Sequence, residues 1–402
     1  MKITSVRAIP LAIPIRPGAP PSPWEASLAK QVLVRIDTDD GLTGWGEAFA
    51  YGAPLAVCNV IDETLGPLLV GEDPARIEAH LDRLQRVLMV WGRRGLAMFA
   101  ISGIDLALWD LAGKSLGVPV WRLMGGPHRE RQRVYWSHCA TYRVENWELF
   151  RVKPLRAMTD VADCAREAAA KGYTALKTNI IWPGNPARRI TQGRTGPHDQ
   201  LASRDIIDQA VAQIGAMREA VGSKVDICLD VNVNFKPSEA LLLARELEPF
   251  KLFWLEIDNQ DAEALVELRA GTRTPLCGGE QLQTVRQYRP FLERHALDTI
   301  MVDVCWQGFS AAKKVADLAE THEINVAPHN YNGHLSSFQA LNFVASVSNV
   351  KIMESDPDAV PLRDELFTVL PEIKDGQMTI PTGPGWGTDL NEKAARAHPW
   401  EG

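Results

Sequence analysis

Short apolar stretches that each end in an acidic residue or a histidine recur at a regular interval in the second half of the chain. Successive polar residues are separated by 26, 24, 23, 26 and 25 positions. They are Asp230, Glu256, Glu280, Asp303, His329 and Glu354. An interval of this length accommodates one buried β-strand and one α-helix, and repeats of that unit build a parallel barrel. The pattern therefore predicts that these side chains lie at the carboxyl ends of successive barrel strands, where such folds place functional groups.

Two earlier strands are expected to complete this barrel. The sequence VYWSHCAT near residues 134–141 predicts the first, and ALKTNI at 175–180 predicts the second. The next interval, 53 residues from Lys177 to Asp230, is about twice the usual length. Its excess lies in residues 181–200, which are rich in Gly, Pro and Arg and show no periodicity. Long loops inside compact domains are usually functional or disordered, so we expect a lid over the barrel mouth, with plain disorder as the alternative.

The first part of the chain has a different pattern. Alternating apolar residues predict a strand near residues 3–13 and a hairpin over 31–48. Helical patterns follow and stop at Gly117, shortly before Pro119. The chain is therefore expected to be an α/β protein in which a small α+β domain caps a barrel. The predicted units are the capping domain, 1–125, the barrel, 126–380, and a C-terminal segment that returns to the cap, 381–402.

Composition restricts the class of protein. At 402 residues the chain exceeds the usual size of one hydrophobic core, so two domains are expected. A net charge of −7 and a pI near 5.8 provide no basic surface for nucleic acid. The N-terminal sequence has too many prolines for a signal peptide, and no uninterrupted apolar run is long enough to span a membrane. The six cysteines are scattered and form no CxxC pair, which favours a reducing cytoplasm.

Three of the acidic residues, Asp230, Glu256 and Glu280, follow successive strands and would converge at one end of a barrel. Carboxylates held close together repel one another unless a divalent cation neutralises them, and Mg²⁺ prefers oxygen ligands of this kind. Any one of the three could instead be a helix N-cap or a surface charge. Three in register are hard to obtain by chance, so the sequence favours a metal-dependent barrel enzyme.

The order of these residues resembles the enolase superfamily, and the histidine–aspartate pair is similar to its mandelate racemase subgroup. The resemblance extends over essentially the whole chain, through GLTGWGEA at 41–48, the segment 104–126 and PGWGTDLN at 384–391. It implies a capped, modified (β/α)7β barrel of the TIM type that binds one Mg²⁺ ion through the three acids above. It also implies removal of the proton α to the carboxylate of a small-molecule substrate, and a homo-oligomeric assembly.

The resemblance assigns a role to each residue of the catalytic group. His329 is the base that takes the α-proton, Asp303 orients its imidazole, and Lys177, the first lysine of a KxK motif, holds the substrate carboxylate. The second position of that motif is Asn179, and an amide cannot take a proton at neutral pH. Racemisation commonly needs a base on both faces, whereas one base suffices to eliminate water. We therefore expect an acid-sugar dehydratase that forms a 2-keto-3-deoxy acid from an aldonate or aldarate.

Other functions stay open on the same site. A racemase, an epimerase or a lactone cycloisomerase could use His329 on one face of the substrate. A non-catalytic acid-sugar-binding protein could have the same fold. Asn179 is compatible with this alternative, because it provides no base on the second face of the substrate.

Further residues are expected to contact the substrate. Glu354 would hydrogen-bond the carboxylate opposite the metal, although a salt bridge at the barrel rim is an alternative. Asn232 would contact the α-hydroxyl or else belong to a turn, and His138 would reach a distal hydroxyl or be a satisfied polar residue. Trp24 and Tyr51 lie on the two cap loops expected to close over the substrate, and each could equally be a surface aromatic.

Two weaker signals complete the candidates. Arg188, Arg189 and Arg194 could bind a second carboxylate, although a solvated run of charge on the lid is the more ordinary interpretation. His334, five residues after His329, is a rival base that is expected to be a loop residue.

Overall fold

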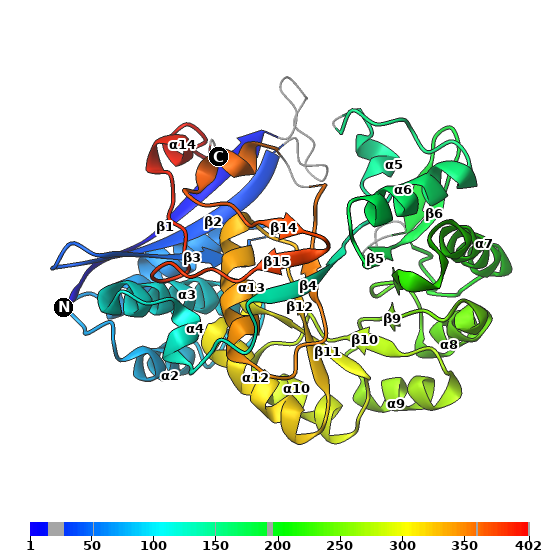
Figure 1. Ribbon diagram of the computed structural model, residues 1–402. Coiled ribbons are helices and arrows are strands. Elements are labelled where there is room, and N and C mark those ends of the chain that lie inside the picture. Colours follow the sequence, from blue (N-terminus) through cyan, green and yellow to red (C-terminus); the bar gives the residue numbers. More distant parts are fainter. Residues whose placement is uncertain (15–27, 51, 149, 191–195, 359–360, 401–402) are drawn as a thin grey trace.

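The computed structural model describes residues 1–14, 28–50, 52–148, 150–190, 196–358 and 361–400. An N-terminal α+β cap lies beside a curled, mostly parallel sheet that is surrounded by helices (Figure 1). The predicted fold class, a barrel with an α+β cap, is confirmed.

The cap is a three-stranded antiparallel sheet with helices packed on it. Each of its three strands pairs in sequence order, and the predicted hairpin is formed by the second and third. The strands are β1 (Ile3–Pro14), β2 (Leu28–Thr38) and β3 (Thr43–Ala48). The helices are α1 (Pro54–Asn59), continued by helical turns at Val60–Leu65 and Gly66–Leu68, then α2 (Ile77–Val87), α3 (Leu96–Leu116) and α4 (Val120–Leu123).

Helix α3 forms the core of the cap. It lies so close to β3 that a Cβ atom at Gly46 would be 2.0 Å from the carbonyl oxygen of Gly103, and one at Gly44 would be 2.3 Å from that of Ala107. Within the described ranges, α3 is the one helix long and apolar enough to cross a membrane, but 78% of its most apolar window is buried inside the protein. Its apolar character is therefore explained by packing on both sides, against the cap sheet and the barrel.

Eight parallel strands and seven crossovers form the barrel. β13 pairs with β4 to curl the sheet, and a single bridge, Val326↔Val350, joins the two ends of it. The strands, in spatial order, are β13 (Met353–Ser355), β4 (Arg131–Trp136), β5 (Ala175–Thr178), β8 (Asp226–Asp230), β9 (Trp254–Glu256), β10 (Leu276–Gly278), β11 (Thr299–Asp303) and β12 (Asn325–His329). The crossover helices are α6 (Met158–Ala170), α7 (Arg204–Val221), α8 (Pro237–Leu247), α9 (Ala262–Gly271), α10 (Thr284–Glu293), α12 (Phe309–Thr321) and α13 (His334–Ser346).

One layer of side chains fills the barrel interior, and every strand contributes to it. The layer is Tyr135, Ala175, Cys228, Trp254, Cys277, Met301, Ala327 and Ile352. Residues two apart on a strand point to the same face, so the next inward layer towards the carboxyl ends is polar. Its members are Ser137, Lys177, Asp230, Glu256, Asp303, His329 and Glu354. The alternation of the strands therefore accounts for the convergence of the charged residues.

The segment after β5 differs from the expected irregular loop. It begins as an antiparallel hairpin of β6 (Ile180–Trp182) and β7 (Arg188–Ile190). Residues 191–195 lie outside the described part of the chain. The lid over residues 181–200 stays a prediction, and its first half has regular structure that the absence of periodicity did not indicate.

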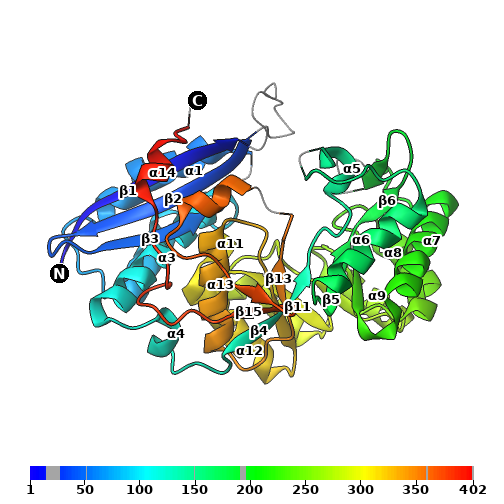
Figure 2. The same cartoon turned by 45° about the horizontal axis from the view of Figure 1, so that its top comes forward.

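The C-terminal part of the chain returns to the cap after the hairpin of β14 (Ile373–Lys374) and β15 (Gln377–Thr379). The Nε1 atom of Trp386 donates a hydrogen bond of 3.0 Å to the carbonyl oxygen of Trp45. Further on, Ala12 N donates to the carbonyl oxygen of His398 at 3.1 Å. Figure 2 shows α14 (Glu392–Arg396), in red, against the blue cap strands.

A buried carboxylate joins these elements, and its removal is expected to cost much stability. Asp110 accepts from the backbone nitrogens of Trp45 and Trp386 and pairs with Lys114 at 2.8 Å. Asp110→Ala would leave all three groups short of a partner, so we expect urea unfolding to show a loss of about 3–5 kcal/mol. The control is Asp389→Ala, because Asp389 contacts the same lysine from the surface and should cost less than about 1 kcal/mol. Equal losses would contradict this account.

Candidate active site

Seven charged residues that the sequence singles out meet at the carboxyl ends of the barrel strands. All of them are buried. They are Lys177, Asp230, Glu256, Glu280, Asp303, His329 and Glu354. Ionised groups are buried at this density only where they neutralise one another or bind a ligand. The contacts between them show how far these groups neutralise one another without a ligand.

Lys177 lies among three of the carboxylates. Its Nζ is 2.7 Å from Glu256 Oε1, 3.1 Å from Glu354 Oε1 and 3.9 Å from Asp230 Oδ2. Burial alone would lower the pKa of Lys177, but Glu256 and Glu354 raise it well above its usual value. The ammonium is thus held in its charged form at the base of the site, the form that can bind a substrate carboxylate.

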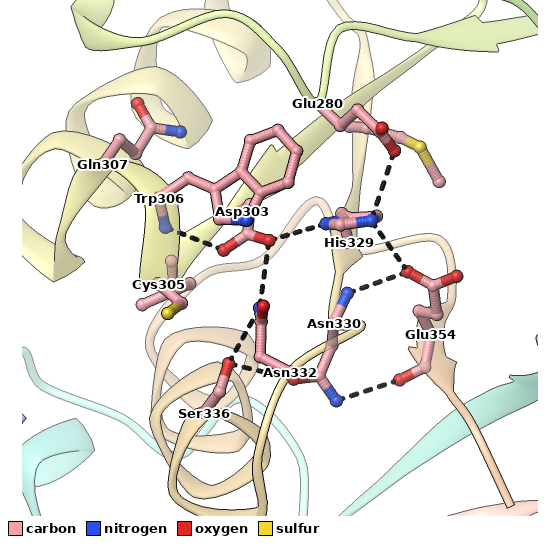
Figure 3. Close-up of polar contacts among 12 residues, drawn as sticks. Glu280, Asp303, Cys305, Trp306, Gln307, His329, Asn330, Asn332, Ser336 and Glu354 are labelled. Atoms are coloured by element: carbon pink, nitrogen blue, oxygen red, sulfur yellow. Dashed lines mark hydrogen bonds and ion pairs between the residues drawn. The ribbon is translucent and has the colours of Figure 1, made fainter. Parts of the chain in front are cut away.

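His329 forms a close pair with the residue opposite it on the neighbouring strand. Its Nδ1 lies 2.6 Å from Asp303 Oδ2, and Asp303 Oδ1 accepts from the backbone nitrogen of Trp306 at 2.9 Å (Figure 3). The register of β11 and β12 places these two residues side by side. A carboxylate fixed on Nδ1 turns Nε2 into the site and stabilises the imidazolium that forms on proton uptake.

The other ring nitrogen faces carboxylates. His329 Nε2 lies 3.3 Å from Glu280 Oε2 and 3.6 Å from Glu354 Oε2. Burial would lower the pKa of His329, but Glu280, Glu354 and Asp303 together raise it well above its usual value. Positive charge bound to these acids would lower the pKa of His329. The imidazole would then be neutral, which is the form that can accept a proton.

Two of the acids, Glu256 and Glu280, have raised pKa values although Lys177 and His329 lie beside them. Burial raises the pKa of Glu256 to about 8, with Asp230 and Glu354 adding to the effect and Lys177 opposing it. Burial likewise raises the pKa of Glu280 to about 7, against the influence of His329. A divalent cation would relieve both, and a set of carboxylate oxygens is the donor set that Mg²⁺ prefers.

The residues present therefore fit a Mg²⁺ ion in their chemistry. Within the described ranges, no three acidic, histidine or cysteine side chains are already grouped around one point as ligands. Lys177 and His329 lie among the acids. The assignment of Asp230, Glu256 and Glu280 as metal ligands stays a prediction.

Glu354 connects the lysine and the histidine. Its Oε2 accepts from the backbone nitrogen of Asn330 at 2.9 Å, and its Oε1 accepts from the Ser137 hydroxyl. Burial would raise the pKa of Glu354, but Lys177 and His329 hold it well below the usual range. The carboxylate is therefore ionised between two cations, and its predicted contact with the substrate is untested.

Asn179 is buried and uses its side chain within the protein. Its Nδ2 donates a hydrogen bond of 2.9 Å to the backbone carbonyl oxygen of Asp230, and the backbone carbonyl oxygen of Asn179 accepts from Gln213 Nε2. The amide therefore ties β5 to the end of β8. Its predicted role in substrate binding stays a prediction, and the position carries no base.

Asn232 and His138 lie at the edge of the same region. Asn232 donates from its backbone nitrogen and its Nδ2 to the two carboxylate oxygens of Asp230, at 2.7 and 3.0 Å. It therefore orients a predicted metal ligand. His138 stacks on Tyr142 with ring centroids 4.4 Å apart, and its Nδ1 lies 3.5 Å from Asp356 Oδ2. Neither prediction of a substrate contact is tested by these positions.

The remaining candidates are placed elsewhere or not described. Trp24, Tyr51 and Arg194 lie outside the described residues. Arg188 covers the Trp182 ring, and Arg189 pairs with Glu145 at 2.9 Å. His334 begins α13 and lies 2.7 Å from Asp364. Neither arginine nor His334 lines the cavity beside His329.

A cavity of about 340 Å³ opens beside His329 between the cap and the barrel. Its lining combines polar strand-end residues with an aromatic wall, in which the rings of Phe49 and Trp306 are 4.5 Å apart and those of Phe49 and Phe99 are 4.9 Å apart. This wall, Arg94 and Asp258, all of which line the cavity, are not among the residues predicted from the sequence. Asp258 could have been found, because it lies two residues after Glu256 and so shares its face.

A change at Asp303 tests how the imidazole is held. Asp303→Asn keeps the size of the side chain but removes the negative charge that faces His329 Nδ1. The change destabilises the tautomer of the imidazole and leaves the ring in place. We expect turnover to fall by about 10²–10⁴-fold, but to stay above that of a variant without the imidazole. Steady-state kinetics over a range of pH checks this, and full activity in Asp303→Asn would show that the pair has no catalytic role.

Comparisons with known proteins follow the two parts of the structure. Residues 16–125 match the mandelate racemase/muconate lactonizing enzyme N-terminal domain family, and residues 160–394 match the enolase C-terminal domain-like family. A D-xylonate dehydratase from Haloferax volcanii is 32% identical over 92% of this chain and 86% of its own length. A D-galactarolactone cycloisomerase from Agrobacterium fabrum is 30% identical over 98% of both chains.

Among solved structures, a crystal structure from Burkholderia xenovorans is similar over nearly the whole chain. It is provisionally named an L-alanine-DL-glutamate epimerase and is bound to magnesium and fumarate. It is 36% identical, has a TM-score of 0.89, and the match covers 99% of this chain and 96% of that one.

Proposed function

The chain belongs to the mandelate racemase/muconate lactonizing enzyme group of the enolase superfamily, and we propose that it is a Mg²⁺-dependent dehydratase of an acid sugar. The observation that carries the proposal is the pairing of one well-built base with an amide at the second candidate position. His329 is held by Asp303, whereas Asn179 cannot take a proton and donates its amide to Asp230. One base suffices for elimination of water.

Each residue of the site has a distinct role in this reaction. The Lys177 ammonium binds and orients the substrate carboxylate. His329 Nε2 removes the proton from the α-carbon, and Asp303 stabilises the imidazolium that results. The imidazolium can then return its proton to the β-hydroxyl as it leaves, so that water is released and the enol product tautomerises to a 2-keto-3-deoxy acid. The aromatic wall and the cap limit access of water to the cavity.

Members of this superfamily bind Mg²⁺, and we propose that Asp230, Glu256 and Glu280 hold it here. When bound, the ion supplies positive charge where negative charge develops on the substrate carboxylate during proton removal. The raised pKa values of Glu256 and Glu280 support this assignment.

The names of relatives support two reactions. One is named as a D-xylonate dehydratase, and others are named as members of the D-galactonate dehydratase family. Others are named as a cycloisomerase and an epimerase, and these reactions also begin by removing an α-proton. The absence of a base at Asn179 favours the dehydratase.

The reaction can be tested directly. The protein with Mg²⁺ is incubated in D₂O with a library of aldonates and aldarates, and each mixture is analysed for 2-keto acid and for deuterium at the α-carbon. We expect 2-keto acid from at least one member. Deuterium incorporation into a substrate that keeps all of its hydroxyl groups would instead establish an epimerase or an isomerase.

Two broader proposals accompany this function. The protein is proposed to form a homo-oligomer, since the stretch of residues 87–91 exposes several large apolar side chains, with Val90 89% and Trp91 55% exposed. Light scattering in solution tests that. A cytoplasmic location is supported by the six cysteines, all of which are buried and unpaired.

A further inference from the structure

A fourth carboxyl group lies beside the predicted metal ligands, and one of its oxygens lacks a partner among the described residues. Asp258 is 7% exposed, and its Oδ2 is buried without a hydrogen bond to any described residue. Its Oδ1 accepts one long bond, 3.3 Å, from the backbone nitrogen of Gly279. A buried carboxyl oxygen without a partner is costly and calls for a specific explanation.

Asp258 lies just beyond the end of β9 and lines the same cavity as Glu280. It follows Glu256 by two residues and so faces the same side of the chain, just as Asn232 follows Asp230. The backbone nitrogen of Asp258 donates to the carbonyl oxygen of Asn232 at 3.0 Å, which fixes the two residues next to each other. The hydrogen bond that Asp258 accepts from the backbone nitrogen of Gly279 places it beside Glu280, the next residue in the chain.

The positive groups of the site are engaged elsewhere. Lys177 is paired with Glu256 and Glu354, and His329 is paired with Asp303 and Glu280. No described lysine, arginine or histidine nitrogen forms an ion pair with Asp258 in the way these two serve the other acids. Asp258 lines the cavity beside the predicted metal ligands, which favours an ion held there, or its bound water, as the missing partner of Oδ2.

We propose that Asp258 is a fourth carboxylate of the cation site and holds Mg²⁺ through one of the waters that the ion retains. Mg²⁺ keeps several waters when it binds to protein carboxylates, and outer groups that hold such ligands affect metal affinity strongly. Asp258 is thus a positioning residue for the metal. The inference rests on the proposed Mg²⁺ dependence but not on the identity of the substrate.

The test is calorimetric titration of the protein with Mg²⁺ alone, without substrate. Asp258→Asn should weaken Mg²⁺ binding by about 10–100-fold. The matched control is Asp261→Asn, three residues along, where the exposed side chain caps α9 and asparagine caps equally well. It should bind Mg²⁺ as the wild type does.

Melting temperatures provide a second readout that a purely structural role would not produce. Without Mg²⁺, Asp258→Asn should melt at or above the wild-type temperature, because the amide keeps the size of the side chain and can donate a hydrogen bond where Oδ2 of Asp258 has no partner. With Mg²⁺, it should gain less stability than the wild type.

Unchanged Mg²⁺ affinity in Asp258→Asn would overturn the proposal, as would a lower melting temperature of the metal-free variant with unchanged affinity. If the wild type itself binds no Mg²⁺, the cofactor proposal fails, which is a different outcome. A wild type that binds Mg²⁺ but dehydrates no acid sugar would leave the test of Asp258 intact.

Discussion

Replacing His329 with asparagine is expected to abolish both dehydration and exchange of the α-proton with solvent. In the described site, Nδ1 of the His329 imidazole is oriented by the Asp303 carboxylate, and the ring lines the cavity. General acid–base groups contribute about 10²–10⁴-fold to turnover, and in this reaction the same ring removes the proton and returns it. We therefore expect the loss to lie at the upper end of that range. NMR in D₂O measures exchange at the α-carbon, and a coupled assay measures 2-keto acid.

Two further variants sharpen the result. Asn179→Ala should alter affinity or orientation but should keep exchange, because the amide never carried the proton. His334→Asn should leave turnover near that of the wild type, since His334 pairs with Asp364 outside the cavity. Exchange that persists in His329→Asn would reveal a second base, revive the epimerase and make Lys177 the first group to examine.

Replacing Glu256 with glutamine is expected to remove Mg²⁺ binding and turnover together. The amide keeps the volume of the side chain and an oxygen that can accept from Trp254 Nε1, now at 3.0 Å, so the fold should survive. The charge that would bind the ion is lost. Since groups outside the coordination sphere alone are worth about 10–100-fold in metal affinity, loss of a ligand charge should exceed that range.

The matched control is Glu263→Gln, the same change on the outer side of α9, where the side chain pairs with Arg294 at the surface. It should retain Mg²⁺ binding and activity. Calorimetry with Mg²⁺ and circular dichroism of both variants separate lost metal affinity from lost structure. Undiminished turnover of Glu256→Gln in chelator-treated buffer would refute the metal assignment.

Much of the fold and of the site's layout could be predicted because both depend on periodicity. The 23- to 26-residue interval carries the strand–helix unit, and the inward face of most strands carries one charged residue after one apolar residue, as Cys228 and Asp230 illustrate. Residues of this kind converge whenever the strands form a barrel. Lys177, His329 and Glu354 could therefore be placed together without knowledge of any contact.

What could not be predicted depends on contacts between distant parts of the chain. Phe49 and Phe99 reach the cavity only because the cap lies against the barrel, and no interval in the sequence encodes that approach. The β6–β7 hairpin was obscured by prolines and arginines that lack alternation. Asp258 was overlooked because it follows a strand by two residues, where side chains are usually assigned to a loop although the inward direction of the strand persists.

The return of the C-terminal segment to the cap has a consequence for how the molecule is made. During synthesis the cap strands leave the ribosome first, but Trp386 and His398, which bond to Trp45 and Ala12, are made after the entire barrel. The nascent cap must therefore wait, with part of β1 and the backbone of β3 unpartnered, until the barrel has been synthesised. The part of the cap that carries Phe49 and covers the cavity then gains its C-terminal contacts last. A chain halted within the barrel would therefore expose the acidic residues of an incomplete active site.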